Sequence, residues 1–407
     1  MLTWLTATME VMYIIFWISL GILFFCYIGY GMLLYLLNTV GRIFRVRKKG
    51  EAELLPVTLI VAAYNEKDIL EEKISNTLAI DYPADKLSII FITDGTTDGS
   101  ESIIRNYPSI TLMHQQERRG KLAAIKRAIQ FVQTPVVIFS DANTILNTEC
   151  IRKIVAHYND PKTGGVAGEK KITEHKKVSA VGEAEGLYWK YESFLKKQDA
   201  GFYTVVGAAG ELFSIRTHLF QAPDDSIILD DFIISMQVCL QGYTIAYEPG
   251  AFAVESPSAS LWEEGKRKLR ISAGAYQSIG YLKSCLNFIK YPRLCFQYVS
   301  RRLLRWVFCP PMILLLLLAN ILIVTDPEQS VFYTGFLVAQ SLFYLLALPG
   351  WLLVRSGKKA GILAIPFYFV FMNYCLVRGF MRFLKGKQTV LWEKSLRQAG
   401  IGRISNR

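Results

Sequence analysis

The sequence is short of the features that mark disulfide-linked or zinc-binding proteins. Only 20% of its 407 residues are charged, below the usual quarter for soluble proteins, while 52% are hydrophobic. The four histidines show no HExxH spacing, and the seven cysteines form no CxxC pair. The cysteines are Cys26, Cys150, Cys239, Cys285, Cys295, Cys309 and Cys375. This argues against a disulfide framework or a zinc site and fits a reducing compartment or a membrane interior.

The composition also bounds the class of protein. It excludes a disordered chain, and 46 basic and 34 acidic residues do not fit inside hydrocarbon, which argues against a purely embedded transporter. The expected protein is membrane-bound with one soluble domain. A net charge of +12 indicates either nucleic acid or an anionic membrane surface, and its location along the chain decides between them.

Long apolar runs predict membrane helices near both ends. The run Met12–Leu37 carries no charge and is long enough for the roughly 30 Å bilayer core. It lacks a basic segment before it and a small-residue cleavage site after it, so we expect an uncleaved anchor. The basic flank at 42–49 then predicts a cytosolic side there and an amino terminus outside.

The carboxyl-terminal third alternates basic and apolar segments. Residues 262–305 are basic and aromatic and predict amphipathic helices in the interface. The apolar runs 306–324 and 331–354 predict a transmembrane hairpin. The last apolar run is 362–376. If successive runs cross the membrane in alternate directions from a cytosolic Arg305, the tail lies outside the cell, whereas the basic residues of the tail favour the cytosolic side. A re-entrant or interfacial helix is the alternative, and the topology of this end stays open.

Between these segments, short β-rich runs alternate with helical patterns. Strands are predicted at 57–64, 87–93, 110–114 and 136–140, with amphipathic stretches such as 68–79 and 121–132 between them. This alternation predicts an α/β domain with a largely parallel sheet and helices on both faces. Ligands of such sheets bind at the carboxyl ends of the strands.

Each predicted strand ends in polar residues that suit a ligand. The first ends in AAYNE (62–66), the second in DGTTDGS (94–100), and the helix at Lys121 opens with RRGK (118–121). Small residues let a backbone approach a ligand, carboxylates bond a ribose or base, and basic residues at a helix amino terminus suit a phosphate. Taken singly, each is equally an ordinary turn or helix cap.

Two further acidic segments suit metal and proton chemistry. Asp141 and Asn143 lie two residues apart after the fourth strand, where oxygen ligands suit Mg²⁺ or Mn²⁺ bridging a diphosphate. Asp230 and Asp231 are adjacent, and adjacent carboxylates can raise each other's pKa and make one of them a general base. A cap, an Asx-turn or an acidic helix start is the structural alternative.

The order of these motifs resembles that of the membrane-bound family 2 glycosyltransferases, the branch with cellulose, hyaluronan and poly-N-acetylglucosamine synthases. The resemblance covers residues 56–305 and implies a GT-A fold, a Rossmann-like nucleotide-diphospho-sugar transferase domain. It implies a nucleotide-sugar site made by Ala63, Asn65, Glu66, Asp94, Gly120, Lys121 and Asp141. It implies a metal, Mg²⁺ or Mn²⁺, at Asp141 and Asn143, where Asn143 replaces the second acid of a DxD motif.

The resemblance also assigns the acceptor side. Asp231 matches the general base and Asp230 the acid before it, while Gly210 and Glu211 belong to a loop beside the acceptor. Polymerising members carry Q-x-x-R-W some three dozen residues later. At that spacing this sequence has RKLRI (267–271), which lacks the tryptophan. The match implies that Arg267 lies on the acceptor side and that Arg270 binds the diphosphate. A later RLLRW (302–306) matches by eye, but we interpret it as membrane anchoring.

The predicted function is inverting transfer of a sugar from a nucleotide-sugar, with UDP as the expected nucleotide, to a growing polysaccharide or membrane-associated acceptor. Bacterial extracellular or capsular polysaccharide synthesis is the expected setting, and whether transfer is processive stays open. Two alternatives are transfer of one sugar to a lipid (polyprenyl phosphate, diphospholipid or ceramide-like) and an inactive membrane scaffold or transport subunit.

The charge map sets the expected location. Positions 42–49, 263–305 and 355–407 hold 26 of the 46 basic residues and three of the 34 acids. The excess charge therefore lies at a membrane surface, and no nucleic-acid partner is expected. The predicted parts are an anchor (1–41), a cytosolic catalytic domain (51–261), interfacial helices (262–305), a membrane region (306–384) and a basic tail (385–407) of a multi-pass inner-membrane protein.

Overall fold

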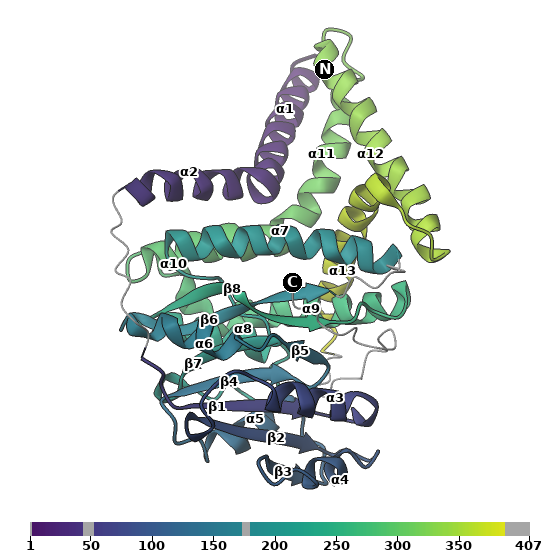
Figure 1. The fold of residues 1–407 in the computed structure, drawn as a ribbon. Coiled ribbons are helices and arrows are strands. Elements are labelled where there is room, and N and C mark those ends of the chain that lie inside the picture. Colours follow the sequence, from purple (N-terminus) through teal and green to yellow (C-terminus); the bar gives the residue numbers. More distant parts are fainter. Residues whose placement is uncertain (1, 44–52, 173–179, 387–407) are drawn as a thin grey trace.

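The computed structural model describes residues 2–43, 53–172 and 180–386. Figure 1 shows a sheet with its covering helices below and a group of long helices above. The predicted cytosolic flank at 45–49 and nearly all of the basic tail lie outside the described residues.

One mixed sheet forms the centre of the body. Its strands are β1 (Val57–Ala63), β2 (Leu87–Asp94), β3 (Thr111–Gln115), β4 (Val136–Asp141), β5 (Thr144–Leu146), β6 (Thr163–Ile172), β7 (Leu212–Arg216) and β8 (Thr244–Glu255). They are ordered β3-β2-β1-β4-β7-β6-β8-β5. The first four are parallel, β6 is parallel to β8, and β7 and β5 run antiparallel to their neighbours. The four predicted strands are confirmed, and the parallel order holds for that half of the sheet.

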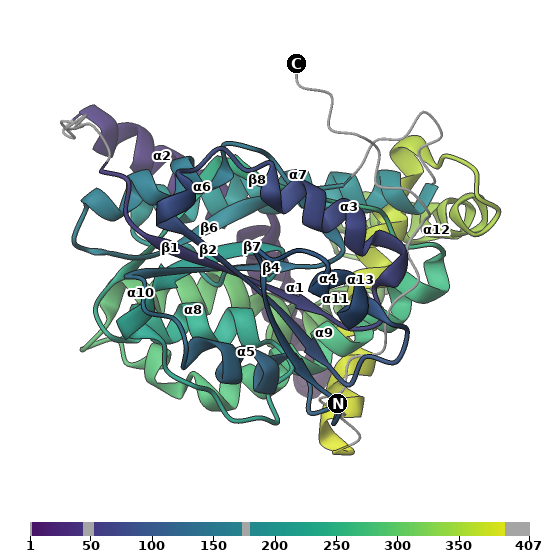
Figure 2. The ribbon, with the colours of Figure 1, turned by 60° about the horizontal axis from the view of Figure 1, so that its bottom comes forward.

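Helices cover both faces, as the alternation of the sequence predicts (Figure 2). In β1, Leu59 and Val61 pack against α3 (Lys67–Leu78), α4 (Ser100–Arg105) and α6 (Cys150–Val155). Ile60 points to the other face, where the core is closed by α5 (Lys121–Ile129) and α8 (Asp230–Leu240). Buried apolar side chains on both faces explain why these strands are continuous hydrophobic runs.

Three more helical elements close the body towards the long helices. They are α7 (Ala180–Phe202), α9 (Leu261–Tyr281) and α10 (Pro292–Tyr298). The π-helical segment η6 (Val299–Phe308) continues α10 directly into α11 (Cys309–Ile323). The sheet, α7, α9 and η6 together surround the cavity described below.

Four segments of the described residues are long and apolar enough to cross a membrane: Thr8–Gly41, Pro292–Ile323, Val331–Arg355 and Gly361–Leu384. The predicted hairpin is formed by α11 and α12 (Val331–Arg355), joined by a short turn. The last segment holds α13 (Ala364–Leu384).

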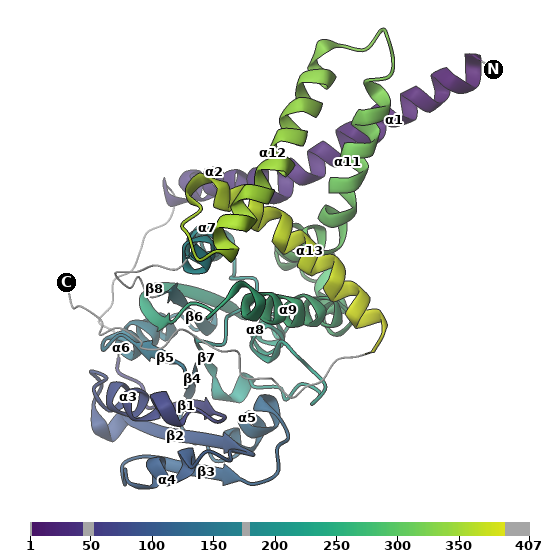
Figure 3. The ribbon, with the colours of Figure 1, turned by 90° about the vertical axis from the view of Figure 1, so that its right-hand side faces the viewer.

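The predicted anchor Met12–Leu37 lies within the candidate span Thr8–Gly41, and this segment is bent. The π-helical segment Phe25–Gly29 separates α1 (Leu2–Phe24) from α2 (Tyr30–Ile43). Figures 1 and 3 show α1 rising beside α11 while α2 lies along α7. Polar groups explain the bend: the Tyr30 hydroxyl donates to Asp199 Oδ1 at 2.5 Å, and Asn38 Nδ2 donates to the Gln198 carbonyl at 2.9 Å. These bonds attach α2 to α7 of the body.

The helix at the carboxyl-terminal end lies along the body. Figure 3 shows α13 descending from α12 towards α9. The Tyr368 hydroxyl donates to Glu264 Oε1 at 3.1 Å, and Gly379 faces Ser272 so closely that a Cβ would collide with it. Both contacts are made with α9, and they lie 11 residues apart along α13, at Tyr368 and Gly379. Gly361–Leu384 is also long and apolar enough to cross a membrane, so this packing agrees with a span as well as with an interfacial helix.

A buried ion-pair cluster joins the membrane helices to the body. Arg301 of η6 bonds Glu192 Oε2 at 2.7 Å and Asp199 Oδ2 at 3.2 Å, both on α7, and its side chain is 1% exposed. Asp199 also accepts the Tyr30 hydroxyl of α2. Three helices from distant parts of the sequence therefore meet at these charges.

Removal of the shared cation should loosen this junction. We expect Arg301→Met to destabilise the protein by about 3–5 kcal/mol, because buried Asp199 loses its ion-pair partner and buried Glu192 is left with Arg305. Thermal melting of the detergent-purified chain measures the effect. The matched control is Arg293→Met, because Arg293 is an exposed arginine on α10. Equal melting temperatures for Arg301→Met and Arg293→Met would refute a stabilising role for Arg301.

Candidate functional site

A cavity of about 310 Å³ lies between the strand ends, α7, α9 and η6. Ten of the side chains that the sequence nominates line it: Glu66, Lys121, Asp141, Asn143, Gly210, Glu211, Asp230, Asp231, Arg267 and Arg270. Ala63, Asp94 and Gly120 line a small adjoining recess. Asn65 lines neither, and its Oδ1 accepts the Thr97 amide at 2.8 Å.

Strand register explains why residues far apart in sequence meet here. Ala62 of β1 pairs with Ile92 of β2 on one side and with Asp141 of β4 on the other. The carboxyl ends of β1, β2 and β4 therefore lie at one edge of the sheet. Ligands of open parallel sheets bind at such an edge.

Asp94 organises the turn before α5. Its carboxylate accepts the amides of Arg119, at 3.1 Å, and Gly120, at 2.6 Å. Gly120 has a φ of +98°, which favours glycine and points its amide at Asp94. Lys121 follows as the first residue of α5. Asp94 thus fixes the position of Lys121, and its contact with a nucleotide stays a prediction. Asp98 lies outside the cavity and accepts the amides of the first residues of α3 and α4, Lys67 at 2.9 Å and Ser100 at 3.0 Å.

Lys121 and Asp141 form an ion pair on the cavity wall. Their Nζ and Oδ1 atoms are 2.5 Å apart. Burial raises the pKa of Asp141 above its ordinary value, although Lys121 opposes the shift. Burial alone would lower the pKa of Lys121. The nearby carboxylates of Asp141, Asp230 and Asp231 raise this pKa by more, so the ammonium stays charged.

The donor set fits a divalent cation that is shared with a substrate. Among the described residues, no three His, Cys, Asp or Glu side chains converge on a metal site. Mg²⁺ in phosphate-transfer sites commonly uses one or two protein oxygens together with substrate phosphates. Asp141 supplies a carboxylate at the cavity. Asn143 Nδ2 donates to Glu255 Oε1 at 3.1 Å, which directs its amide plane along the same wall.

Asp231 has the environment of a general base. It lies in the first turn of α8, and its Oδ1 accepts the amide of Phe232 at 2.8 Å. Burial and the adjacent Asp230 raise the pKa of Asp231 from 3.8 to about 7. Gly210 allows the backbone to pass close to Lys121 and Asp231. A Cβ atom at this position would lie 3.1 Å from Lys121 Nζ and 3.2 Å from Asp231 Oδ2. A base with a pKa near the working pH accepts protons efficiently.

The two arginines of α9 behave differently. Arg267 is held by Glu185 at 2.6 Å and Glu264 at 3.1 Å, so its guanidinium serves the packing of α9 at the cavity wall. Arg270 also lines the cavity, and within the described part of the chain it makes no hydrogen bond. Its charge lies near Asp230, Asp231 and Asp141. Arg270 is therefore the arginine that can bind an anionic ligand.

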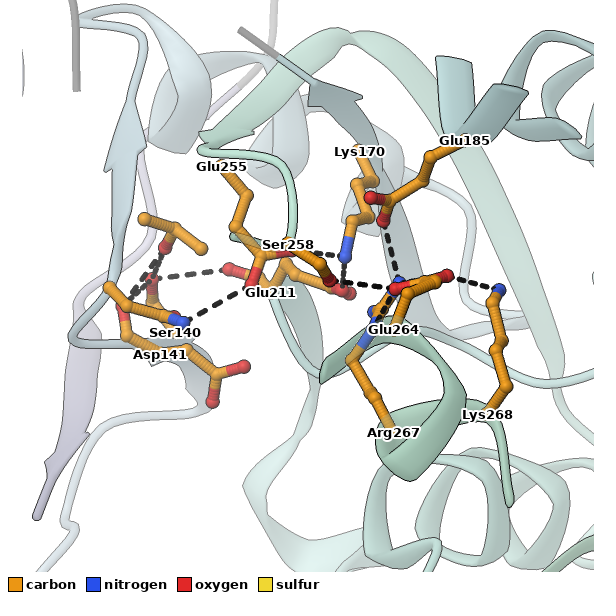
Figure 4. A network of polar contacts seen from close by, with 12 residues as sticks. Ser140, Asp141, Lys170, Glu185, Glu211, Glu255, Ser258, Glu264, Arg267 and Lys268 are labelled. Carbon is orange, nitrogen blue, oxygen red and sulfur yellow. Dashed lines mark hydrogen bonds and ion pairs between the residues drawn. The ribbon is translucent and has the colours of Figure 1, made fainter. Parts of the chain in front are cut away.

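A buried lysine that the sequence did not indicate supports the acceptor-side loop. Figure 4 shows Lys170 between Glu211 and Glu255, next to the Arg267 network. Burial alone would raise the pKa of Glu211, but Lys170 lowers it to about 2. Glu211 is therefore a charged, positioned group rather than a proton acceptor.

Sequence reasoning missed the wall formed by α7 and η6. It consists of Tyr188, Trp189, Glu192 and Lys196 from α7 and Arg302 and Trp306 from η6. The Trp306 ring packs against Phe232, with centroids 5.6 Å apart, directly beside Asp231. The interpretation of 302–306 as membrane anchoring alone is therefore incomplete. Two features of the sequence could have indicated this wall. One is the arginine-tryptophan spacing in RLLRW (302–306), and the other is the i, i+7 spacing that places Trp189 and Lys196 on one face of a helix.

The sheet and cavity define a GT-A glycosyltransferase domain. The structure of mannosyltransferase PcManGT from Pyrobaculum calidifontis, in complex with GDP-Man and Mn²⁺, matches 92% of this chain and 100% of that chain. The TM-score is 0.68 at 19% sequence identity, so the likeness establishes the fold. The chain belongs to the family described as glycosyltransferase like family 2, whose sequence profile matches residues 55–274.

Curated relatives are poly-beta-1,6-N-acetyl-D-glucosamine synthases. That of Staphylococcus aureus (strain MSSA476) is 29% identical over 241 residues, 55% of this chain and 56% of the relative. That of Staphylococcus epidermidis (strain ATCC 35984) is 25% identical over 242 residues, 56% of this chain and 57% of the relative. The match with this chain thus spans a little over half the length of these relatives.

Proposed function

We propose that the chain is an inverting, membrane-bound glycosyltransferase that extends a polysaccharide from a UDP-sugar, in bacterial extracellular polysaccharide synthesis. One observation carries this proposal: in a family 2 chain, a carboxylate with a pKa of about 7, Asp231, faces the Lys121–Asp141 pair across one cavity. Proton acceptance and diphosphate binding are the two tasks of such a transfer.

On the donor side, the recess beside Ala63, Asp94 and Gly120 takes the nucleotide. Lys121 and Arg270 bind the diphosphate, because both are cations in a partly enclosed site where charges interact strongly. Asp141, with Asn143, would hold Mg²⁺ or Mn²⁺, which neutralises charge that develops on the leaving diphosphate. Glu66 and Asn65 support this edge of the sheet.

On the acceptor side, Asp231 takes the proton of the attacking hydroxyl. Burial, together with Asp230, keeps the pKa of Asp231 raised, so that the proton is accepted near neutral pH. Gly210 and Glu211 shape the floor on which the acceptor lies. Attack from the face opposite the diphosphate in a single displacement inverts the anomeric centre.

We propose that the body sits on the cytosolic leaflet. Residues 51–261 make the catalytic domain, 262–305 the interfacial helices, and 1–41 and 306–384 the membrane parts. Basic residues around these parts favour anionic headgroups. The bend before α2 supports this arrangement, because it lays α2 along α7 of the body (Figure 1).

The experiment is incubation of the purified membrane protein with a panel of UDP-sugars and Mn²⁺, followed by mass analysis of the products. The proposal predicts a ladder of glycan masses. A single lipid-linked sugar would establish the lipid-acceptor alternative instead. Absence of donor turnover and of metal-dependent UDP binding would indicate a scaffold.

A further inference from the structure

One lysine of α3 lies completely inside the body. Lys73 is 0% exposed, and it shares the buried face of the helix with Leu70, Ile74 and Thr77. A helix that covers a sheet normally turns an apolar stripe towards it. An ammonium is costly to bury unless hydrogen bonds or an opposite charge compensate it. The presence of a lysine at this position therefore has to be explained by its contacts.

The Lys73 amino group bonds the turn between β4 and β5. Its Nζ donates to Ser140 Oγ at 2.9 Å, to the Thr144 carbonyl at 2.8 Å and to Thr144 Oγ1 at 3.4 Å. An ammonium has three protons, so these acceptors satisfy it. Burial lowers the pKa of Lys73 to about 7, but the neutral amine still has two protons for the two shorter bonds. All three acceptors are neutral, so the bonds fix the positions of Ser140 and Thr144.

Ser140 and Thr144 lie on either side of the segment that would hold the cation. Thr144 Oγ1 donates to the Asp141 carbonyl at 2.9 Å, which closes the turn. Ser140 Oγ donates to the Glu211 carbonyl at 3.2 Å, and Figure 4 shows Ser140 beside Asp141 and Glu211. Lys73 is therefore attached to both ends of the segment and, through Ser140, to the acceptor-side loop.

The alternation of β4 places Lys73 and the Asp141 carboxylate on opposite faces of the sheet. Ile138 packs in the core beneath α3, whereas Phe139 packs in the core beneath α5 and α8. Since side chains alternate along a strand, Ser140 points towards α3 and Asp141 towards the cavity. Lys73 thus supports the segment from behind and does not touch a ligand in the cavity.

The segment has to be held because its carboxylate has a competing partner. Lys121 Nζ lies 2.5 Å from Asp141 Oδ1, and a divalent cation has to take over this carboxylate. Glu255 fixes Asn143 by accepting its Nδ2 at 3.1 Å. Lys73 adds support from the α3 face of the sheet. Groups that orient metal ligands matter nearly as much as the ligands, because they fix the ligand geometry in advance.

We propose that Lys73 is a positioning residue for the divalent cation. It holds both ends of the segment that carries Asp141 and Asn143, so that these side chains are presented to the cation and diphosphate together. Without Lys73, the Thr144 carbonyl loses its partner, and the turn is free to follow the ion pair with Lys121. This inference rests on the proposed function, since it concerns the cation site of that transfer.

The same helix provides a matched control. Asn76, one turn after Lys73, bonds the backbone of Leu146 in both directions: its Nδ2 donates to the carbonyl at 2.7 Å, and its Oδ1 accepts the amide at 2.8 Å. Asn76 therefore attaches α3 to β5, but beyond the turn. Asn76→Ala should loosen the packing of α3 and leave the cation site as it is.

The test is UDP binding to the full chain in detergent at pH 7, by equilibrium dialysis, with EDTA and across a range of Mn²⁺ concentrations. Lys73→Met should need about 10–100-fold more Mn²⁺ than wild type to reach the same UDP affinity, the range that loss of a ligand-orienting group costs. With EDTA, its UDP affinity should equal that of wild type. Asn76→Ala should match wild type in both conditions. In turnover assays, saturating Mn²⁺ should restore most of the kcat of Lys73→Met.

A second variant keeps the proposal falsifiable if Lys73→Met does not fold. Ser140→Ala removes one acceptor of Lys73 and should raise the Mn²⁺ requirement in the same direction by a smaller factor. Equal Mn²⁺ requirements in Lys73→Met, Ser140→Ala and Asn76→Ala would overturn the inference, and so would an equal loss of UDP binding with EDTA. Donor turnover by wild type would then still uphold the proposed function. If wild-type UDP binding ignores Mn²⁺ and no donor is turned over, both fail.

Discussion

Replacement of Asp231 by Asn is expected to lower kcat by about 10²–10⁴-fold, the range that a positioned general base contributes. The amide keeps the shape of the side chain but cannot accept the proton of the acceptor hydroxyl. Nucleotide release in the presence of acceptor measures the loss. Asp225→Asn is the matched control, because Asp225 is an exposed carboxylate whose ion pair with Lys126 contributes little.

The pH profile should identify the base independently. Because the pKa of Asp231 is raised to about 7, wild-type kcat/KM should rise with pH up to about 7 and then level off. The Asn variant should lose this limb. A wild-type profile that is flat between pH 5.5 and 8 would assign proton transfer to another group.

The same shift makes a prediction about stability. The folded state holds the Asp231 proton up to about pH 7, whereas the unfolded chain releases it near 3.8. Stability therefore falls as pH rises from about 4 to 7, and the full cost is present above that range. Asp231→Asn avoids this cost, so it should melt higher than wild type at pH 8. A lower melting temperature at pH 8 would contradict the assigned environment.

Replacement of Asp141 by Asn should be the second most damaging change, with about a 10²–10³-fold loss in donor turnover, comparable to removal of one preorganised charge contact. The variant removes the carboxylate that pairs with Lys121 and that suits a divalent cation. Half-activating Mn²⁺ concentration and donor KM should both rise, and titration of the metal with nucleotide release as readout measures them.

The control for Asp141 is another strand-end carboxylate. Asp98→Asn alters a residue that, among the described residues, bonds only the first residues of α3 and α4, namely the Lys67 amide and Ser100. It should retain the metal requirement and kcat of wild type. Equal losses in both variants would mean that the damage spreads through the loops and does not arise from lost charge at the cavity.

The sequence predicts the parallel half of the sheet because β1, β2 and β4 are buried on both faces and read as continuous apolar runs. Register then brings Ala62, Ile92 and Asp141 to one edge, so polar residues that follow apolar runs in the sequence indicate the site. The two groups that bear most on the mechanism, Asp141 and Asp231, are found in this way.

What the sequence could not predict depends on contacts between distant segments. The bend after α1 is set by Tyr30 and Asn38 meeting α7, about 160 residues later, and hydropathy alone cannot indicate it. Arg267 and Arg270 look equivalent in sequence, but only the fold brings Glu185 against Arg267. Lys196 is one of several lysines on α7, and its burial at the cavity follows from packing.

The most direct test of the proposed transfer is NMR observation of the first product as it forms from an α-linked UDP-sugar, with Mn²⁺ and acceptor present. The proposed mechanism predicts a β-anomeric proton in the product at the rate of UDP release, with both lost in Asp231→Asn. An α-configured product, or UDP release that Asp231→Asn leaves unchanged, would contradict a single displacement in which Asp231 is the base.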